Sequence, residues 1–242
     1  DEVWVTSKGT ADSLRNMGYN GDFVVMPNGI DLPVGKVSQG KIDQIKKELH
    51  IQEDIPVFMF VGRLMWYKNI RLILESLAEV KAKGKKFKML FLGIGKDEKG
   101  IKHLVRKLGL KDDVIFVGKI LDRDYLKTYY GVADLLLFPS IFDTNGLVVR
   151  EASSCLVPSL LVEGSCAAEG IVDMETGFLC KEDKNDMADK IISIMDNKKL
   201  LEKVGKKAST DIYLSWEDSV RNAFERYKVV IENYKNKNKK TL

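Results

Sequence analysis

The sequence lacks any apolar run long enough to cross a lipid bilayer. A membrane-spanning helix needs about 20 consecutive apolar residues, and every apolar run here is interrupted well before that length. A secretory signal is also missing, because the chain begins at Asp1 with VWVTS, which resembles the middle of a strand. We therefore expect a globular, soluble protein, and the start in mid-strand predicts that the chain is part of a longer polypeptide.

Cysteine and histidine are scarce as well. The chain has three cysteines and two histidines, and neither His50 nor His103 stands at metal-ligand spacing from a cysteine. This excludes a zinc site or a Cys–His nucleophile, and the odd number of cysteines fits a reducing cytoplasm. Asp122-Arg123-Asp124 has the D-x-D form of metal-dependent sugar transferases, but it directly precedes a helical pattern, where aspartate is a natural cap. We predict no metal site.

Charge of either sign is not concentrated. The 39 basic and 35 acidic residues leave a net charge of +4, which is too small and too evenly spread to indicate a nucleic-acid partner. The exception is the lysine-rich run at 235–240. We interpret this run as a solvated, frayed tail; the alternative is a patch that touches a membrane surface. The expected location is cytoplasmic, and the alternative is a peripheral position at the inner face of the membrane.

What the chain does have is an alternation of short apolar runs with amphipathic segments. The segment at 70–80 places apolar residues at helical spacing, with lysine and glutamate on the opposite face. The short runs are almost wholly apolar, as in strands that are buried on both faces of a parallel sheet. Strands are predicted at 23–26, 57–61, 87–92, 114–117, 135–138 and 159–162, and helices at 41–49, 69–83, 98–108, 122–131 and 146–154. This alternation predicts an α/β fold: a Rossmann-like parallel sheet with helices on both faces.

The two ends of the chain depart from the alternation. Residues 1–21 contain one strand, one short helix and several turn residues, and we interpret them as the remnant of a preceding domain. Residues 22–242 are expected to form the main domain. No strand is predicted after Gly177; a helical C-terminal tail follows instead, with helices near 184–196, 198–209 and 216–235.

Two predicted loops lie beyond the carboxyl ends of strands, where open parallel sheets bind ligands. In the first, Gly62 permits close approach of the backbone, and Arg63 and Lys68 bring two positive charges that suit a diphosphate. The alternative is a solvated arginine and a lysine that only begins a helix. In the second, Gly93-Ile94-Gly95 forms a tight turn, but the third glycine of a dinucleotide fingerprint is replaced by glutamate. Binding of NAD is therefore poorly supported.

The stretch 139–163 is the most informative part of the sequence. It runs from the end of a buried strand through an Asn145-Gly146 turn into a helix that begins near Leu147. The first backbone N–H groups of a helix have no intrahelical partner and attract phosphate. Asp143 and Glu151 bracket this turn, and Glu151 could accept hydrogen bonds from sugar hydroxyls. The alternative for Glu151 is an ordinary surface position on the helix.

Five segments resemble, in their order, the C-terminal donor-binding domain of GT-B glycosyltransferases of group 1 (glycosyltransferase family 4). They are PNGID at 27–31, FVGRLMWYKN at 60–69, FLGIG at 91–95, FVGKI at 116–120 and FPSIFDTNGLVVREA at 138–152. Their joint order is more specific than any one of them. The resemblance implies one half of a GT-B architecture, in which the helix at 216–235 crosses back onto an N-terminal acceptor domain that this chain does not contain.

The resemblance also implies roles for the site residues. Arg63 and Lys68 would hold the diphosphate, Glu151 would bind the ribose, and Asp143 would be the catalytic acid that faces the donor sugar. The family usually has glutamate at the position of Asp143, so the choice of sugar is open. The other residues that we assign to nucleotide binding are Gly62, Gly93, Gly95, Lys119, Ile120, Asn145, Gly146 and Leu147.

The implied reaction is transfer of a sugar from a nucleoside diphosphate, such as a UDP- or GDP-sugar, with retention at the anomeric carbon and without a metal or other cofactor. The implied partners are the nucleotide-sugar donor and the missing N-terminal domain, without which the chain is expected to be inactive. A glycolipid acceptor is one option. Two alternatives remain open: one half of a nucleotide-sugar epimerase, and a nucleotide-binding module without catalysis.

Overall fold

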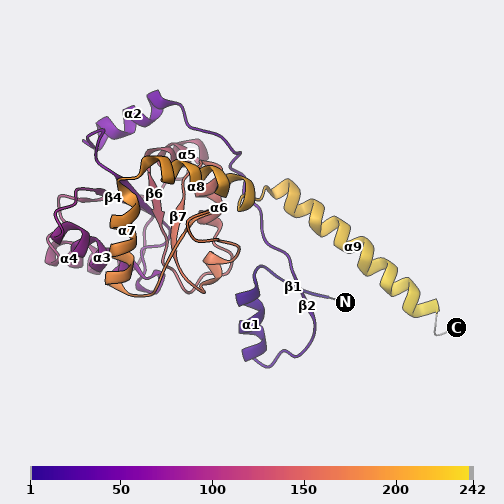
Figure 1. The fold of residues 1–242 in the computed structure, drawn as a ribbon. Helices are drawn as coiled ribbons and strands as arrows, with labels where there is room; N and C mark the ends of the chain where they lie inside the picture. Colours follow the sequence, from indigo (N-terminus) through magenta and orange to yellow (C-terminus); the bar gives the residue numbers. More distant parts are fainter. Residues whose placement is uncertain (1, 240–242) are drawn as a thin grey trace.

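Six parallel strands form the central sheet of the computed structural model, which describes residues 2–239 (Figure 1). The strands are β3 (Val57–Val61), β4 (Lys88–Leu92), β5 (Val114–Gly118), β6 (Leu135–Leu137), β7 (Ser159–Val162) and β8 (Phe178–Cys180), in the spatial order β5-β4-β3-β6-β7-β8. The central strands β3, β4, β6 and β7 are buried almost throughout, because helices cover both faces. The predicted α/β parallel sheet is confirmed, and five of its strands coincide with the predicted apolar runs.

The sixth strand, β8, contradicts the prediction that strands end at Gly177. It pairs in parallel with β7 through Leu160 and Phe178, Leu161 and Leu179, and Val162 and Cys180. An edge strand of three residues carries too short an apolar run to be distinguished from a loop by its pattern. Its place in the sheet follows from pairing with β7, which the local sequence does not encode.

The helices form two layers on opposite faces of the sheet (Figure 1). One layer contains α3 (Ile70–Ala82), which packs against α4 (Glu98–Lys107) and α7 (Lys184–Met195); in the other, α5 (Arg123–Val132) packs against α2 (Gln39–Glu48) and α6 (Leu147–Ser154). α8 (Lys198–Asp211) contacts both α6 and α7. Right-handed crossovers produce two layers because the chain moves one way from β3 to β5 and the other way from β6 to β8.

The order in which successive strands are added to the sheet reverses between β3 and β6, although all six strands are parallel. β3 pairs with β4 on one side and with β6 on the other, although more than seventy residues separate β3 from β6 in the chain. Loops that leave the carboxyl ends of such a strand pair turn to opposite faces of the sheet and open a crevice between them. We therefore expect a ligand to bind beyond Val61 and Leu137.

A smaller unit, which we call the projecting unit, extends from this domain (Figure 1). It consists of residues 2–25 and α9 (Trp216–Lys239). Within it, β1 (Val3–Val5) and β2 (Phe23–Val25) pair in parallel and are joined by α1 (Lys8–Asn16). The strand predicted at 23–26 therefore forms, but it pairs with β1 and not with the central sheet. The domain boundary at residue 21 stays a prediction.

α9 is the longest helix of the described residues. Arg226 on α9 holds Glu2 in a two-pronged ion pair, with nitrogen–oxygen distances of 2.8 and 2.6 Å. The helix continues to Lys239, so the frayed tail expected from residue 235 is wrong as far as Lys239, and Lys240 lies outside the described residues. No helix among residues 2–239 is both long and apolar enough to span a membrane.

Candidate functional site

The predicted site residues lie at one edge of the sheet, in the four connections that follow the carboxyl ends of β5, β4, β3 and β6, which are neighbours in that order. The loops after β3 and β4 touch, since the Leu64 N–H donates to the Ile94 carbonyl at 3.1 Å. Gly62 (φ 153°) and Gly93 (φ 130°) adopt backbone conformations that favour glycine, and a side chain on Gly93 would strike the Gly62 carbonyl oxygen. Gly93 therefore permits the close packing of these two loops, and Gly62 permits the backbone conformation at the end of β3.

Lys68 and Asp143 meet at the point where the strand order reverses. Lys68 ends the short helix η1 (Trp66–Lys68) after β3, and Asp143 lies in the loop after β6. The Lys68 Nζ is 2.7 Å from Asp143 Oδ2, and the two side chains are only 12% and 18% exposed. Lys68 lies just before α3, as in the alternative of a lysine that only begins a helix, but its side chain is largely buried against Asp143. Arg63 is exposed and has its guanidinium carbon 5.7 Å from the centre of the Tyr67 ring.

The other oxygen of Asp143 closes the turn into α6. Oδ1 accepts hydrogen bonds from the backbone N–H groups of Asn145 at 3.1 Å and Gly146 at 2.7 Å. Gly146 has φ 58° and ψ 41°, a left-handed conformation that glycine adopts without strain. Two of the N–H groups expected to receive a phosphate are thus already bonded to Asp143. An anion at this turn would compete with the carboxylate or bind beside it.

The charge of Asp143 is favoured by these contacts. Burial alone raises the pKa of the carboxyl, but the Lys68 ammonium and the N–H groups of Gly146 and Asn145 outweigh burial, and the pKa lies below its ordinary value. Asp143 is therefore an anion at neutral pH, paired with the cation that the sequence assigned to a diphosphate.

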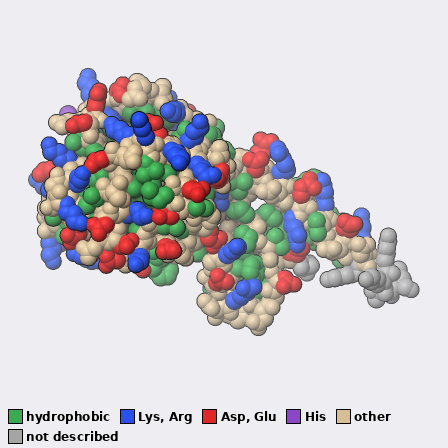
Figure 2. Space-filling model, in the orientation of Figure 1, with side chains coloured by type: hydrophobic (Ala, Val, Ile, Leu, Met, Phe, Trp, Pro, Cys, Tyr) green, Lys and Arg blue, Asp and Glu red, His purple; other side chains and the backbone are tan. Residues whose placement is uncertain are grey.

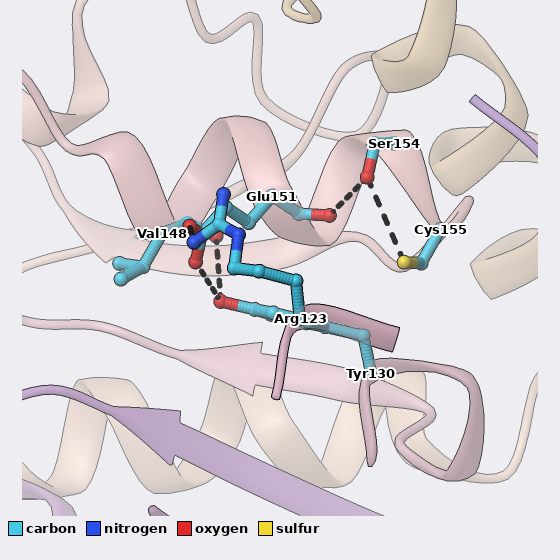
Figure 3. A network of polar contacts seen from close by, with 6 residues as sticks. All are labelled: Arg123, Tyr130, Val148, Glu151, Ser154 and Cys155. Atoms are coloured by element: carbon cyan, nitrogen blue, oxygen red, sulfur yellow. Dashed lines mark hydrogen bonds and ion pairs between the residues drawn. The ribbon is translucent and has the colours of Figure 1, made fainter. Parts of the chain in front are cut away.

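Glu151 lies one turn further along α6 and points toward α5 (Figure 3). It is only 8% exposed, so the surface alternative is wrong. Its Oε2 accepts from the Tyr130 hydroxyl at 2.8 Å, and its Oε1 accepts from Arg123 Nη1 at 3.1 Å. Burial raises the pKa of Tyr130 well above its ordinary value, and the charge of Glu151 raises it further. The hydroxyl therefore stays protonated and acts as the donor.

The remaining predicted residues line the same edge. Lys119 is exposed and Ile120 is half-buried in the loop that leads from β5 to α5. Gly95 packs so closely on Leu64 that a side chain there would meet the Leu64 backbone. Leu147, the first residue of α6, is 37% exposed. The fold brings these residues to one place, and their contact with a ligand stays a prediction.

Tyr130 and Arg123 are the neighbours of Glu151 that the sequence analysis missed. Tyr130 falls on the apolar face of a helical pattern and is indistinguishable there from a packing residue. Arg123 is the middle residue of the D-x-D segment, where the pattern indicates only a helix cap. The capping prediction for that segment is confirmed, since Asp122 Oδ1 accepts from the Tyr125 N–H at 2.7 Å. Within residues 2–239, no group of three or more His, Cys, Asp or Glu side chains could hold a metal ion.

The arrangement suits an elongated ligand that is anionic in one part and rich in hydroxyl groups in another. Arg63 supplies an exposed cation at the crevice, and Lys68 supplies a partly buried one. Asp143 and Glu151 supply carboxylate acceptors eight positions apart on the same strand–helix connection. Carboxylates that accept hydrogen bonds are suited to sugar hydroxyls, and arginine and lysine are suited to phosphate oxygens.

The family model for glycosyl transferases group 1 matches residues 41–211. Among curated proteins, N-acetyl-alpha-D-glucosaminyl L-malate synthase of Bacillus anthracis is 28% identical over 171 residues, which cover 70% of this chain and 44% of that protein. The chain thus spans about half the length of the curated relatives it matches, as it also does for an uncharacterized glycosyltransferase of Methanocaldococcus jannaschii, of which it covers 48%.

Solved structures share the fold at low sequence identity. HepE from Anabaena, in complex with UDP-glucose, has a TM-score of 0.84 and 18% identity, with 94% of this chain and 64% of that chain covered. The C-terminal domain of the group 1 family protein LpcC from Francisella tularensis has a TM-score of 0.64 and 21% identity. That comparison covers 76% of this chain and 96% of the LpcC domain.

Proposed function

The chain belongs to the glycosyl transferases group 1 family and has the fold of the C-terminal half of a GT-B enzyme, and from this premise we propose that it is the donor-binding half of a retaining, metal-independent glycosyltransferase. The proposed donor is a nucleoside diphosphate sugar. UDP-glucose is the first candidate, because HepE was crystallised with that ligand. The acceptor half of the enzyme would be supplied by a domain that precedes this chain.

The observation that carries the proposal is the Lys68–Asp143 pair at the reversal of the sheet. A partly buried cation stands where the fold opens its ligand crevice, 2.7 Å from an acid. The bond that breaks during transfer joins the sugar to the diphosphate, and a lysine and a carboxylate at this place can each lie beside one of these two groups. Lys68 would stabilise the diphosphate as it gains charge, and Asp143 would lie beside the sugar.

The negative charge that develops on the leaving diphosphate is the chemical problem that the site must solve. Preorganised cations stabilise such charge most strongly where water is largely excluded. Lys68, with a 12% exposed side chain, meets this condition. Arg63 is exposed and would add a planar pair of donors as it closes on the phosphates. These two cations replace the metal ion that other transferases use.

Lys68 must exchange partners in this scheme. Its ammonium is bonded to Asp143, and a diphosphate would take over part of that contact. The N–H groups of Asn145 and Gly146 would be released in the same movement if Asp143 turns toward the sugar. Binding of the donor would therefore bring Asp143 beside the sugar. Because its side chain is one methylene shorter than the usual glutamate, its length would affect which sugar is accepted.

The projecting unit supports a preceding acceptor domain as the partner. A two-stranded sheet is marginally stable in water by itself, and β1 and β2 form such a sheet. The exposed face of α9 adds Phe224, Tyr227, Ile231 and Tyr234, which are 59%, 56%, 51% and 68% exposed (Figure 2). An apolar stripe at helical spacing is typical of a helix that packs against another domain. We place the enzyme in the cytoplasm, and the three free cysteines agree with that location.

A transfer assay on the longer protein that supplies the preceding domain tests this function. UDP-, GDP- and ADP-sugars are offered with a panel of acceptors, and the anomeric configuration of the product is determined by NMR. The proposal predicts release of the nucleoside diphosphate and a product with retained configuration. A product in which the sugar stays on the nucleotide with one centre inverted would show the epimerase alternative instead.

A further inference from the structure

We infer that Tyr130 is a positioning residue for Glu151, and that Arg123 is an exchangeable partner whose place the ligand's ribose takes; this inference rests on the proposed function. Glu151 is the acid that would bind the ribose. Its two oxygens have different partners, which lie at two positions on α5 (Figure 3). Those partners differ in burial.

The hydrogen bond from Tyr130 to Glu151 Oε2 is expected to persist when a ligand binds. Tyr130 is fully buried, and its hydroxyl lies 2.8 Å from Oε2 and 3.5 Å from the Val148 carbonyl oxygen. Water cannot replace Glu151 as the partner of so deeply buried a hydroxyl. Loss of this hydrogen bond would therefore leave a buried donor and a buried charge unsatisfied. The raised pKa of the phenol keeps the proton on Tyr130. Oε2 is therefore fixed, and the plane of the carboxylate is fixed with it.

The contact of Arg123 with Glu151 Oε1 is of the opposite kind. The Arg123 side chain is 47% exposed, and its Nη1 lies at 3.1 Å, the longer of the two contacts. Arg123 is the first residue of α5, directly after the loop that carries Lys119 and Ile120. Because the Arg123 guanidinium can be solvated when it is released, this contact is the more easily exchanged of the two. Oε1 is thus the oxygen on the open side of Glu151, and Arg123 neutralises it until hydroxyl donors arrive.

This division gives each group a separate effect on binding. Without the Tyr130 hydroxyl, Glu151 keeps its charge but loses the bond that aims it at the crevice. Without the Arg123 charge, Glu151 keeps its orientation, and the ribose hydroxyls no longer compete with Arg123 for Oε1. The first change should weaken recognition of ribose, and the second should strengthen it.

The test measures binding of UDP, GDP and ADP to this chain and selects the nucleotide that binds best. The selected nucleotide is compared with its 2′,3′-dideoxy form, which lacks the ribose hydroxyls and keeps the base and the diphosphate. The variants are Tyr130→Phe, Arg123→Gln, Glu151→Gln and the double variant Tyr130→Phe/Glu151→Gln. Tyr129→Phe is the matched control, because it removes a phenol hydroxyl from the same helix about 100° away around the axis.

For Tyr130→Phe, we expect binding of the ribose nucleotide to weaken about tenfold, which is the size of one net hydrogen bond. Binding of the dideoxy form should stay within about twofold, and so should both ligands with Tyr129→Phe. The double variant should bind no more weakly than Glu151→Gln alone, because Tyr130 acts through Glu151. Equal weakening of both nucleotides by Tyr130→Phe, or further weakening in the double variant, would overturn the positioning role.

Arg123→Gln keeps the proposal testable even if Tyr130→Phe fails to fold, because Arg123 is half-exposed. We expect up to about fivefold tighter binding of the ribose nucleotide and no change for the dideoxy form. Weaker binding of the ribose nucleotide would overturn the exchange. If the unchanged chain binds none of the three nucleotides, the proposed function itself fails, and that result is distinct from normal binding that is insensitive to Tyr130.

Discussion

The six-stranded domain and the projecting unit differ in the burial of their large apolar side chains. In the domain, strands such as β3 and β4 are almost wholly buried between two helical layers. In the projecting unit, α9 leaves a stripe of large apolar residues exposed, and β1 and β2 form a sheet of only two strands. This difference fits the proposal that the projecting unit packs against another domain.

The two parts touch at more than one place: the Glu169 carboxylate accepts from the backbone N–H groups of Lys8 and Gly9 at 2.9 and 2.7 Å, and backbone hydrogen bonds also join the parts near Ile30. The Ile30 N–H donates to the Leu214 carbonyl at 3.0 Å, and the Trp216 N–H donates to the Ile30 carbonyl at 3.2 Å. The chain therefore leaves the projecting unit and returns to it at the same place. We expect a division of labour in which the domain holds the nucleotide and α9 contributes nothing to nucleotide affinity.

Lys68→Ala should produce the largest change. A charge-assisted hydrogen bond contributes about 1.5–3 kcal/mol, so affinity for a nucleoside diphosphate should fall about 10- to 150-fold. Because Lys68 is 12% exposed and paired with Asp143, stability should also fall, by about 1–3 kcal/mol. Calorimetry and urea unfolding measure the two effects.

The matched control for this change is Lys96→Ala, which removes an exposed lysine from the neighbouring loop after β4. It should change stability by less than about 0.5 kcal/mol. If both variants lost affinity equally, general charge and not the position of Lys68 would explain binding.

Glu151→Gln and Asp143→Asn should separate the two acids. Glu151→Gln should weaken the bare nucleotide and its sugar conjugate alike, because both carry ribose, by about tenfold. Asp143→Asn should leave bare UDP bound at least as tightly as before, since the carboxylate competes with the diphosphate for Lys68. It should weaken only the preferred sugar conjugate. Four titrations measure these affinities, and equal weakening of both ligands by Asp143→Asn would remove that residue from the sugar.

Acid should remove the contribution of Asp143 to stability. Its pKa is lowered in the folded chain, so the contribution is fully present above the unfolded pKa of about 3.9 and is lost as the pH falls through the folded value. The parent should therefore be more stable than Asp143→Asn at neutral pH, and the gap should close below about pH 4. Unfolding of both proteins across this range measures the gap; a constant gap would contradict the ion pair with Lys68.

Changes on α9 should have the smallest effect on the nucleotide. Phe224→Ser with Ile231→Ser should leave UDP affinity within about twofold, because both side chains lie on the exposed stripe, 59% and 51% exposed. The same double variant should reduce self-association and binding of an apolar dye, and Val172→Ser in the domain, at 51% exposure, is the control. A large loss of UDP affinity would break the division of labour between the domain and α9.

Patterns within single segments predicted most of the domain. The apolar runs at β3, β4 and β6 and the helical spacing of α3 identified those elements, because burial on both faces of the sheet leaves a strong local signal in a strand. β8 was missed and β2 was assigned to the wrong sheet for a common reason. Short strands are placed by the neighbour they pair with, and three residues do not specify that neighbour.

The site shows the same limit. The glycines and cations at Gly62, Arg63 and Lys68 could be found from sequence, since a loop after a strand needs those residue types to bind a diphosphate. The burial of Glu151 could not, because it depends on the packing of α5 against α6. The hydrogen bond from Tyr130 to Glu151 could not be predicted either, because it forms only when α5 packs against α6.

Titration of this chain with UDP, GDP and ADP in the presence of a chelator tests the central claim most directly. The account predicts that at least one of these nucleotides binds by calorimetry without a divalent cation. It also predicts that Glu151→Gln weakens that binding about tenfold. Absence of binding to all three, or binding that appears only when magnesium is added, would contradict a metal-independent donor site.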